Sequence, residues 1–254
     1  MSLNWNDITH VTKADPAKEL PRDLGILAGT DAVMVGGSDG VTAENTLDTI
    51  RAIRGSFPDK LVLQEPHSSN HVSTDTIEAV DYLAVPAVYN GDREHFVGKH
   101  LDMFTEVGSK PDDVFGSGLP VLGDVVAAKG RDAVDRIADK IVGEGYVVQN
   151  PESKAATVTG VTKPLSVEQV VGAALATENF YGFPLFYLEY SGTYGGPEDV
   201  AAAARYLDDA VLLYGGGIES ERQTREILDA GADAVVVGDC FHDHPERYRE
   251  TVLS

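Results

Sequence analysis

The sequence of 254 residues is poor in cysteine, poor in lysine and free of long apolar runs. Its one cysteine, Cys240, excludes a disulfide framework and a cysteine-based metal cluster. No stretch approaches the roughly 18 uninterrupted apolar residues of a membrane-spanning helix. Residues 1–7 also lack the basic and apolar regions of a secretory signal. We therefore expect a cytoplasmic protein that is not an integral membrane protein.

Positive charge is scarce throughout the chain. Asp and Glu together number 41 against 20 Lys and Arg, which gives a formal net charge of −21, and nine Lys stand against 24 Asp. A field of this sign repels nucleic acid and anionic membranes, so we expect no nucleic-acid partner. The acidic residues are spread along the chain rather than collected in a tail. This favours a halophile, where salt screens the self-repulsion, over an ordinary solvated acidic face.

Short runs rich in Val, Leu and Ile alternate with amphipathic segments that begin at helix-capping residues. Apolar character on both faces is typical of strands in a parallel sheet covered by helices. We predict a single α/β domain over residues 1–254, a TIM-type (β/α)₈ barrel, with an open doubly wound sheet as the alternative. The expected strands are 8–12, 31–37, 61–64, 82–88, 146–149, 185–190, 210–216 and 232–238, and the expected helices include 42–53, 166–175, 197–207 and 220–231.

Residues 109–145 are the least regular part of the sequence. Residues 111–120 have the Gly, Pro, Ser and Asp composition of a loop, and a helix is expected over 132–142. No second core-sized segment follows. We therefore interpret 109–142 as an insertion on a barrel that has one irregular βα unit, not as a domain boundary.

Polar and glycine-rich clusters follow the expected strands, where the active sites of barrels lie. Glycines 215–217 come after the seventh strand and Gly238 after the eighth. Backbone amides and a helix N-terminus at this place favour a bound phosphate. A tight turn without a ligand is the alternative for these glycines.

Three side chains near other strand ends have suitable chemistry. Lys13 can neutralise a phosphate, and Asp15 can hold Mg²⁺ with help from Ser38. A surface salt bridge is the alternative for Lys13 and Asp15. Glu189 interrupts an apolar and aromatic strand, which makes it a candidate general base or, alternatively, a structural partner of Lys13.

Two further features near the end of the chain receive structural interpretations. His242 and His244 have no third ligand at metal-motif spacing, so we expect a solvated helix entry before Pro245. Cys240 has no recognisable partner histidine and is expected to be a buried small apolar residue rather than a nucleophile.

Five motifs together resemble the geranylgeranylglyceryl phosphate synthase family and its bacterial relatives, the heptaprenylglyceryl phosphate synthases. The resemblance runs from about residue 8 to 253 in motif order. The block at 187–196 is specific, whereas many phosphate-binding barrels share the glycine motifs. The motifs are HVTKADPAK (10–18), VGGSDGV (35–41), YLEYSGTYGG (187–196), YGGGI (214–218) and VVVGD (235–239).

The resemblance implies a Mg²⁺-dependent prenyltransferase. It would join geranylgeranyl diphosphate to the 3-hydroxyl of sn-glycerol 1-phosphate and release pyrophosphate, forming the first ether bond of archaeal membrane lipids. The family commonly forms homodimers. Carried over to this sequence, Glu189 would be catalytic and Asp15 and Ser38 would be the metal ligands. The glycerol phosphate site would comprise Lys13, Tyr187, Leu188, Glu189, Tyr190, Ser191, Gly192, Gly217, Gly238 and Asp239.

The sequence departs from the family pattern in two places. Asp239 replaces the usual Asn, and since a carboxylate repels phosphate we expect only its backbone amide to make a contact. The 109–142 insertion is also longer than in the family. For the prenyl tail we consider an apolar trough lined from Tyr82, Leu83, Val85, Tyr89, Phe96 and Phe104, for each of which core packing is the alternative.

Two other function classes stay open at this point. A phosphate-binding barrel isomerase or aldolase would need a Schiff-base lysine, for which only Lys13 is suitably placed, or an acid–base pair across strand ends. A non-catalytic barrel that binds a phosphorylated ligand would retain the glycine loops but would not need Glu189.

Overall fold

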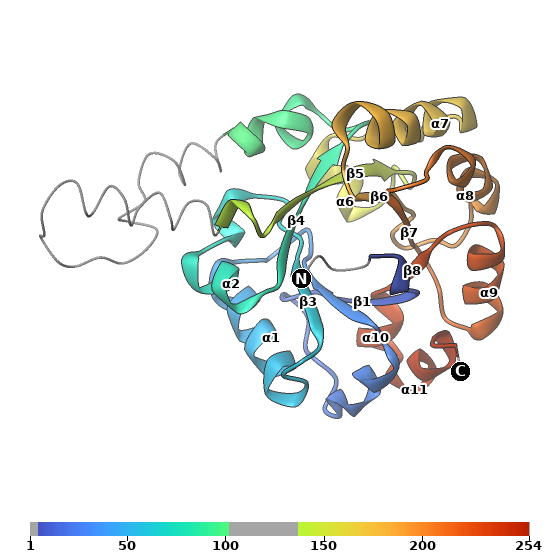
Figure 1. Cartoon of the computed structure of the whole chain (residues 1–254). Coiled ribbons are helices and arrows are strands. Elements are labelled where there is room, and N and C mark those ends of the chain that lie inside the picture. Colours follow the sequence, from blue (N-terminus) through green and yellow to red (C-terminus); the bar gives the residue numbers. More distant parts are fainter. Residues whose placement is uncertain (1–4, 102–136, 254) are drawn as a thin grey trace, which may run out of the picture.

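Eight parallel strands close into a barrel in the order β1 to β8, and helices surround it (Figure 1). The structure is a computed structural model that describes residues 5–101 and 137–253. The predicted (β/α)₈ fold is therefore confirmed, and the open sheet is excluded. The strands are β1 (His10–Ala14), β2 (Ala32–Val35), β3 (Leu61–Gln64), β4 (Tyr82–Val88), β5 (Ile141–Val148), β6 (Leu185–Glu189), β7 (Val211–Gly215) and β8 (Ala234–Val237).

The barrel has two apolar layers because side chains alternate between the two faces of each strand. On β6, Leu185 and Tyr187 belong to the cluster inside the barrel, and Phe186 and Leu188 to the cluster under the helices. Burial on both faces explains the nearly continuous apolar runs of the sequence.

Helices begin at the capping residues that the sequence indicates. Ser166 and Gln169 cap each other's backbone N–H at the start of α7, and Thr42 with Asn45 does the same for α1. The helices are α1 (Ala43–Ser56), α2 (Thr74–Ala79), α6 (Lys154–Thr159), α7 (Val167–Leu175), α8 (Pro197–Ala203), α9 (Glu221–Asp229), α10 (Asp239–Asp243) and α11 (Pro245–Tyr248). Short 3₁₀ segments are η1 (Trp5–Asp7), η2 (Leu24–Gly29), η3 (Ser69–His71), η6 (Ala204–Tyr206) and η7 (Arg249–Thr251), and π-helical turns are η4 (Glu94–Gly98) and η5 (Ala176–Tyr181). None of these helices is both long and apolar enough to cross a membrane.

Two strands, β1 and β5, extend beyond their predicted bounds, whereas β2, β6, β7 and β8 are one or two residues shorter than predicted at one or both ends. β1 lies two residues later than predicted, so Lys13 is on the strand rather than after it. β5 starts at Ile141, not at 146, and the predicted helix over 132–142 was wrong at its C-terminal end, where Ile141 and Val142 are strand. Most of the predicted insertion at 109–142 lies outside the described residues.

Candidate functional site

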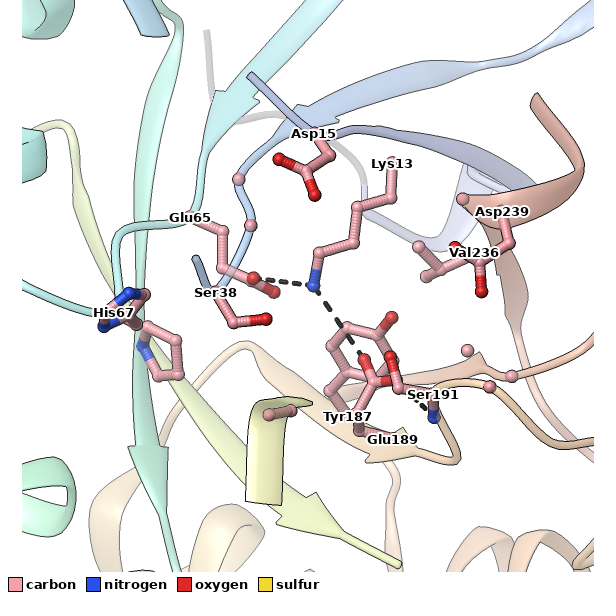
Figure 2. A pocket seen from close by; sticks show the side chains of 18 of the residues that line it. Lys13, Asp15, Ser38, Glu65, His67, Tyr187, Glu189, Ser191, Val236 and Asp239 are labelled. Atoms are coloured by element: carbon pink, nitrogen blue, oxygen red, sulfur yellow. Dashed lines mark hydrogen bonds and ion pairs between the residues drawn. The ribbon is translucent and has the colours of Figure 1, made fainter. Parts of the chain in front are cut away.

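An open cavity of about 220 Å³ lies at the ends of the strands where the sequence places its polar clusters (Figure 2). Side chains from across the barrel enter it because the carboxyl ends of parallel strands share one mouth. The predicted site residues that line the cavity are Lys13, Asp15, Ser38, Tyr187, Glu189, Ser191, Gly192, Gly217, Gly238 and Asp239.

Two of the predicted site residues do not line this cavity. Leu188 is fully buried in the cluster under the helices, because its neighbours Tyr187 and Glu189 occupy the inward positions of β6. The Tyr190 hydroxyl donates to buried Asp199 at 2.5 Å, and the Tyr190 ring stacks on Tyr214. The side chains of Leu188 and Tyr190 therefore support the site from behind, which corrects the expectation of direct contact.

Lys13 lies in the centre of the barrel mouth between two carboxylates. Its Nζ is 2.7 Å from Glu65 Oε2 and 3.8 Å from Glu189 Oε2 (Figure 2). Burial by itself would lower the pKa of Lys13, but these two carboxylates outweigh it and raise that pKa above its ordinary value. Lys13 is thus a cation inside the cavity and not half of the surface salt bridge with Asp15 that was the alternative.

Glu189, at the end of β6, is only 3% exposed and is held by two hydrogen bonds. Its Oε2 accepts from the Tyr146 hydroxyl at 2.8 Å, and its Oε1 accepts from the backbone N–H of Ser191 at 2.7 Å. Lys13 adds the longer ion pair. A fixed carboxylate that lines the cavity is suited to accept a proton from a bound hydroxyl group.

Two buried carboxylates beside Lys13 were missed by the sequence interpretation. Glu65 follows β3, and Glu144 points from β5 with both carboxylate oxygens buried and without a hydrogen-bond partner in the part of the chain that is described. Burial raises the pKa of Glu144 well above its ordinary value and so favours its protonated form. A lone glutamate in an apolar segment was the available signal for Glu144, as it was for Glu189.

Glycines at the ends of β7 and β8 form the other side of the cavity. At Gly217, where φ is +56°, a Cβ would lie 2.7 Å from the backbone of Thr193 and Tyr194, so only glycine fits there. At Gly238 a Cβ would meet nothing closer than 3.5 Å. The Asp239 carboxylate pairs with Lys18 at 2.9 Å, and both residues line the cavity.

Asp15 and Ser38 offer oxygen atoms from the loops after β1 and β2. Asp15 Oδ1 accepts from the Ala17 backbone N–H at 2.9 Å, and the Asp15 carboxylate lies against Gly37, where any Cβ would collide with it. Among the described residues no group of three His, Cys, Asp or Glu side chains is arranged to hold a metal ion. The pair nevertheless fits Mg²⁺, which takes few protein oxygens and completes its shell with water and phosphate oxygens.

His242 has a specific role beside Asp15 that corrects the expected solvated helix entry. Its Nε2 accepts from the Asp15 backbone N–H at 2.9 Å, and its Nδ1 therefore carries the proton and donates to the Glu19 carbonyl at 3.0 Å. His244, by contrast, is exposed. Cys240 is buried as expected, and burial raises the pKa of its thiol to about 12, so it stays protonated.

The apolar wall of the cavity differs from the expected trough. Pro86 and Val88 of β4 face Ala155 and Val158 of α6 across this wall. Of the expected residues, Tyr82 packs on Trp5 at the opposite end of β4, and Leu83 and Val85 are core side chains. Tyr89 and Phe96 form an aromatic group with Tyr181, and Phe104 lies outside the described residues.

Known proteins are similar to this chain over nearly its whole length. A heptaprenylglyceryl phosphate synthase of Lysinibacillus sphaericus is 35% identical, covering 95% of this chain and 92% of its own. A geranylgeranylglyceryl phosphate synthase of Methanocella arvoryzae is 34% identical, over 99% and 98%. The solved structure of (S)-3-O-geranylgeranylglyceryl phosphate synthase from Thermoplasma acidophilum, in complex with its substrate sn-glycerol-1-phosphate, has the same fold, with a TM-score of 0.73, 23% identity and coverage of 96% and 92%. The PcrB family profile matches residues 3–254, and the chain belongs to this family.

Proposed function

We propose that the protein is a prenyltransferase that joins geranylgeranyl diphosphate to the 3-hydroxyl of sn-glycerol 1-phosphate and releases pyrophosphate. The observation that carries this proposal is the convergence of Lys13, Glu189 and the glycine loops of β7 and β8 on one cavity. Family membership and relatives with this type of activity in their names support the same reaction.

Glycerol phosphate fits the side of the cavity formed by the glycines. In the proposed complex its phosphate lies against the backbone at Gly217 and Gly238, and the Lys13 ammonium balances its charge. The glycerol hydroxyls then point toward Glu189 in the centre of the mouth. This placement leaves the opposite side, between β1 and β4, for the prenyl diphosphate.

Glu189 serves as the proton acceptor of the reaction. The 3-hydroxyl oxygen forms a bond to the allylic carbon as the bond from that carbon to the diphosphate breaks, and the electron pair leaves with pyrophosphate. The hydroxyl proton passes to the Glu189 carboxylate, whose orientation is fixed by Tyr146 and the Ser191 backbone. Lys13, with its Nζ 3.8 Å from Glu189 Oε2, places a positive charge beside that carboxylate.

Mg²⁺ is the cofactor that the donor set fits. Asp15 would hold the ion with its carboxylate and Ser38 with its hydroxyl. The ion supplies neutralisation of the charge on the leaving diphosphate. His242 fixes the backbone at Asp15, which keeps the carboxylate beside Gly37 and directed at the cavity.

The first isoprene units of the substrate meet the apolar wall. Pro86 and Val88 on one side and Ala155 and Val158 on the other exclude water from the allylic carbon, which gains positive charge during the reaction. Relatives named for a geranylgeranyl and for a heptaprenyl product are almost equally similar to this protein, at 34% and 35% identity. The length of the prenyl group is therefore decided by experiment.

The test is incubation with sn-glycerol 1-phosphate and prenyl diphosphates of several lengths, with and without Mg²⁺ and over a range of salt concentrations. We expect an ether product of the geranylgeranyl chain by mass spectrometry, no product in EDTA, and activity that rises with salt because salt screens the net charge of −21. Absence of an ether product under all conditions would favour an isomerase, aldolase or non-catalytic barrel. Light scattering tests the homodimer, and cell fractionation tests the cytoplasmic location.

A further inference from the structure

Lys99 is a buried lysine on the side of the cavity away from the glycine loops. It follows the π-helical turn η4, which comes after β4, and it is 6% exposed. Lys99 lines the same cavity as Lys13, and its Nζ has no hydrogen-bond partner among residues 5–101 and 137–253. In the closed order of eight strands, β4 stands opposite β8, so Lys99 approaches the mouth from across the barrel.

The carboxylates near Lys99 do not neutralise it fully. Glu65 directs one oxygen to Lys13, at 2.7 Å, and its other oxygen makes no hydrogen bond to any described residue. Glu144, the second nearby acid, is held neutral by burial. Burial lowers the pKa of Lys99 to about 8, although the charge of Glu65 raises it. A buried ammonium with this little compensation is stabilised when an anion joins it.

We propose that Lys99 binds the diphosphate group of the prenyl substrate and balances its charge as it leaves. The proposal rests on the proposed function, which requires two anionic substrates in one cavity. Lys13 and the glycine loops serve the glycerol phosphate, and Lys99 occupies the part of the mouth that they leave. Figure 2 shows this division, with Glu65 and His67 on one side, Asp239 and Ser191 on the other, and Lys13 between them.

Charge and bond changes are consistent with this place for Lys99. When the bond between the allylic carbon and the diphosphate oxygen breaks, the electron pair and an additional negative charge stay on pyrophosphate. A positive group already fixed beside that oxygen stabilises the charge as it develops, and it needs no rearrangement of solvent. Pro86 and Val88, which share β4, place the apolar wall for the prenyl chain next to this position.

Calorimetric binding to pyrophosphate with Mg²⁺, and separately to sn-glycerol 1-phosphate, tests the assignment. Lys99→Met is expected to weaken pyrophosphate binding about 10- to 100-fold, the effect of removing a charged hydrogen bond, and to change glycerol phosphate binding less than about threefold. Lys99→Arg keeps the charge and should restore most of the affinity. Lys163→Met, at an exposed lysine away from the cavity, is the matched control and should leave both affinities unchanged.

A second measurement needs no charge-removing variant, in case Lys99→Met does not fold. At about pH 8.5 more than half of the Lys99 side chains are neutral, so pyrophosphate binding by the wild type should take up a proton that Lys99→Arg, always charged, does not. Buffers of different ionisation enthalpy report this uptake. The charged or titratable groups that act on Lys99 or are affected by it are Glu65, Glu144, Glu94, Asp92, His67, His71 and His100, and all are common to both proteins.

The outcomes separate Lys99 from the function itself. Equal losses for both ligands in Lys99→Met, unchanged pyrophosphate binding, or equal proton uptake by wild type and Lys99→Arg would each overturn the role of Lys99. If the wild type forms the ether product while these results hold, the prenyltransferase proposal stands without Lys99. If the wild type binds pyrophosphate through Lys99 but forms no ether product, the proposed function fails instead.

Discussion

Replacement of Glu189 by glutamine separates its chemical role from its structural one. The glutamine carbonyl can accept from the Ser191 backbone N–H, as Glu189 Oε1 does at 2.7 Å, and its amide can donate to the Tyr146 oxygen, 2.8 Å from Oε2. Both contacts are therefore retained. Lys13 loses its 3.8 Å partner but keeps Glu65 at 2.7 Å. We expect Glu189→Gln to lower the free energy of unfolding by no more than about 1–2 kcal/mol.

The effect of Glu189→Gln on catalysis should be much larger. A glutamine amide cannot accept the proton of the glycerol hydroxyl, and a positioned general base contributes about 10²- to 10⁴-fold to the rate. This corresponds to about 3–5 kcal/mol on the barrier. The assay is the rate constant for ether formation at saturating concentrations of both substrates and Mg²⁺, followed by mass spectrometry, with thermal unfolding measured in parallel.

Glu144→Gln is the matched control for this experiment. Glu144 is as buried as Glu189 and lies in the same barrel, but burial raises its pKa and keeps it neutral, so the substitution removes no charge. Its rate should stay within about threefold of the wild type. A Glu189→Gln rate within threefold of the wild type, or an equal loss in both variants, would refute the reasoning that Glu189 accepts the proton.

Three further predictions concern the glycine loops, the barrel base and the loop after β1. Gly238→Ala should change the free energy of unfolding by no more than about 0.5 kcal/mol but raise the KM for glycerol phosphate about tenfold or more, and an unchanged KM would contradict the phosphate site. Gly217→Ala should lower the free energy of unfolding by about 1–3 kcal/mol, because the φ of Gly217 is positive. Burial lowers the pKa of His10 to about 4, so between pH 6.5 and pH 4 the native state binds fewer protons than the unfolded state. The free energy of unfolding should therefore fall by about 3 kcal/mol as the pH drops from about 6.5 to 4. Denaturant titrations at several pH values should show a smaller fall for His10→Gln, and an equal fall in both proteins would argue against this role of His10. His242→Ala, which removes the acceptor for the Asp15 backbone N–H, should raise the Mg²⁺ concentration for half-maximal activity about tenfold, and an unaltered Mg²⁺ titration would count against that positioning role.

The sequence allowed the barrel to be predicted because each strand is apolar on both faces. The two strands that extend beyond their predicted bounds, β1 and β5, each carry an ionisable side chain inside the barrel, Lys13 and Glu144. The predicted first strand stopped before Lys13 because a charged residue is unusual in a buried strand. Lys13 is accommodated there by Glu65 and Glu189, which lie at the ends of other strands and are distant in the sequence. In β5, Gly143 and Gly145 surround Glu144 and interrupt the apolar pattern. These glycines are required because side chains from the π-helical turn η5 and the residues after it fill the space of a Cβ.

The site was predictable where it depends on single strand ends and not where it depends on contacts across the barrel. Asp15 and Gly238 come directly after β1 and β8, and Ser38 comes three residues after β2, so position alone places all three at the cavity that they line. Lys99 lies in a helical turn and acquires a functional interpretation only from its burial in the common cavity. Of the residues carried over from the 187–196 motif, Leu188 and Tyr190 do not line the cavity, since the chain there directs every second side chain away from it.

The charges of the cavity explain how so acidic a chain can accept two anions. In the ligand-free protein Lys13 is engaged by Glu65 and Glu189, and a phosphate must compete with them for the ammonium. Burial raises the pKa of Glu65 despite Lys13, so a proton can bind to Glu65 at modest cost when a second anion takes the lysine. Glu144 is already neutral for the same reason. Proton binding by buried carboxyl groups thus removes negative charge where the substrates arrive, while the exposed acidic residues keep theirs. Salt screens the repulsion between surface charges, but it shields buried pairs far less. The protonation of Glu65 and Glu144, which burial favours, therefore acts on anion binding in addition to the screening of the net charge of −21.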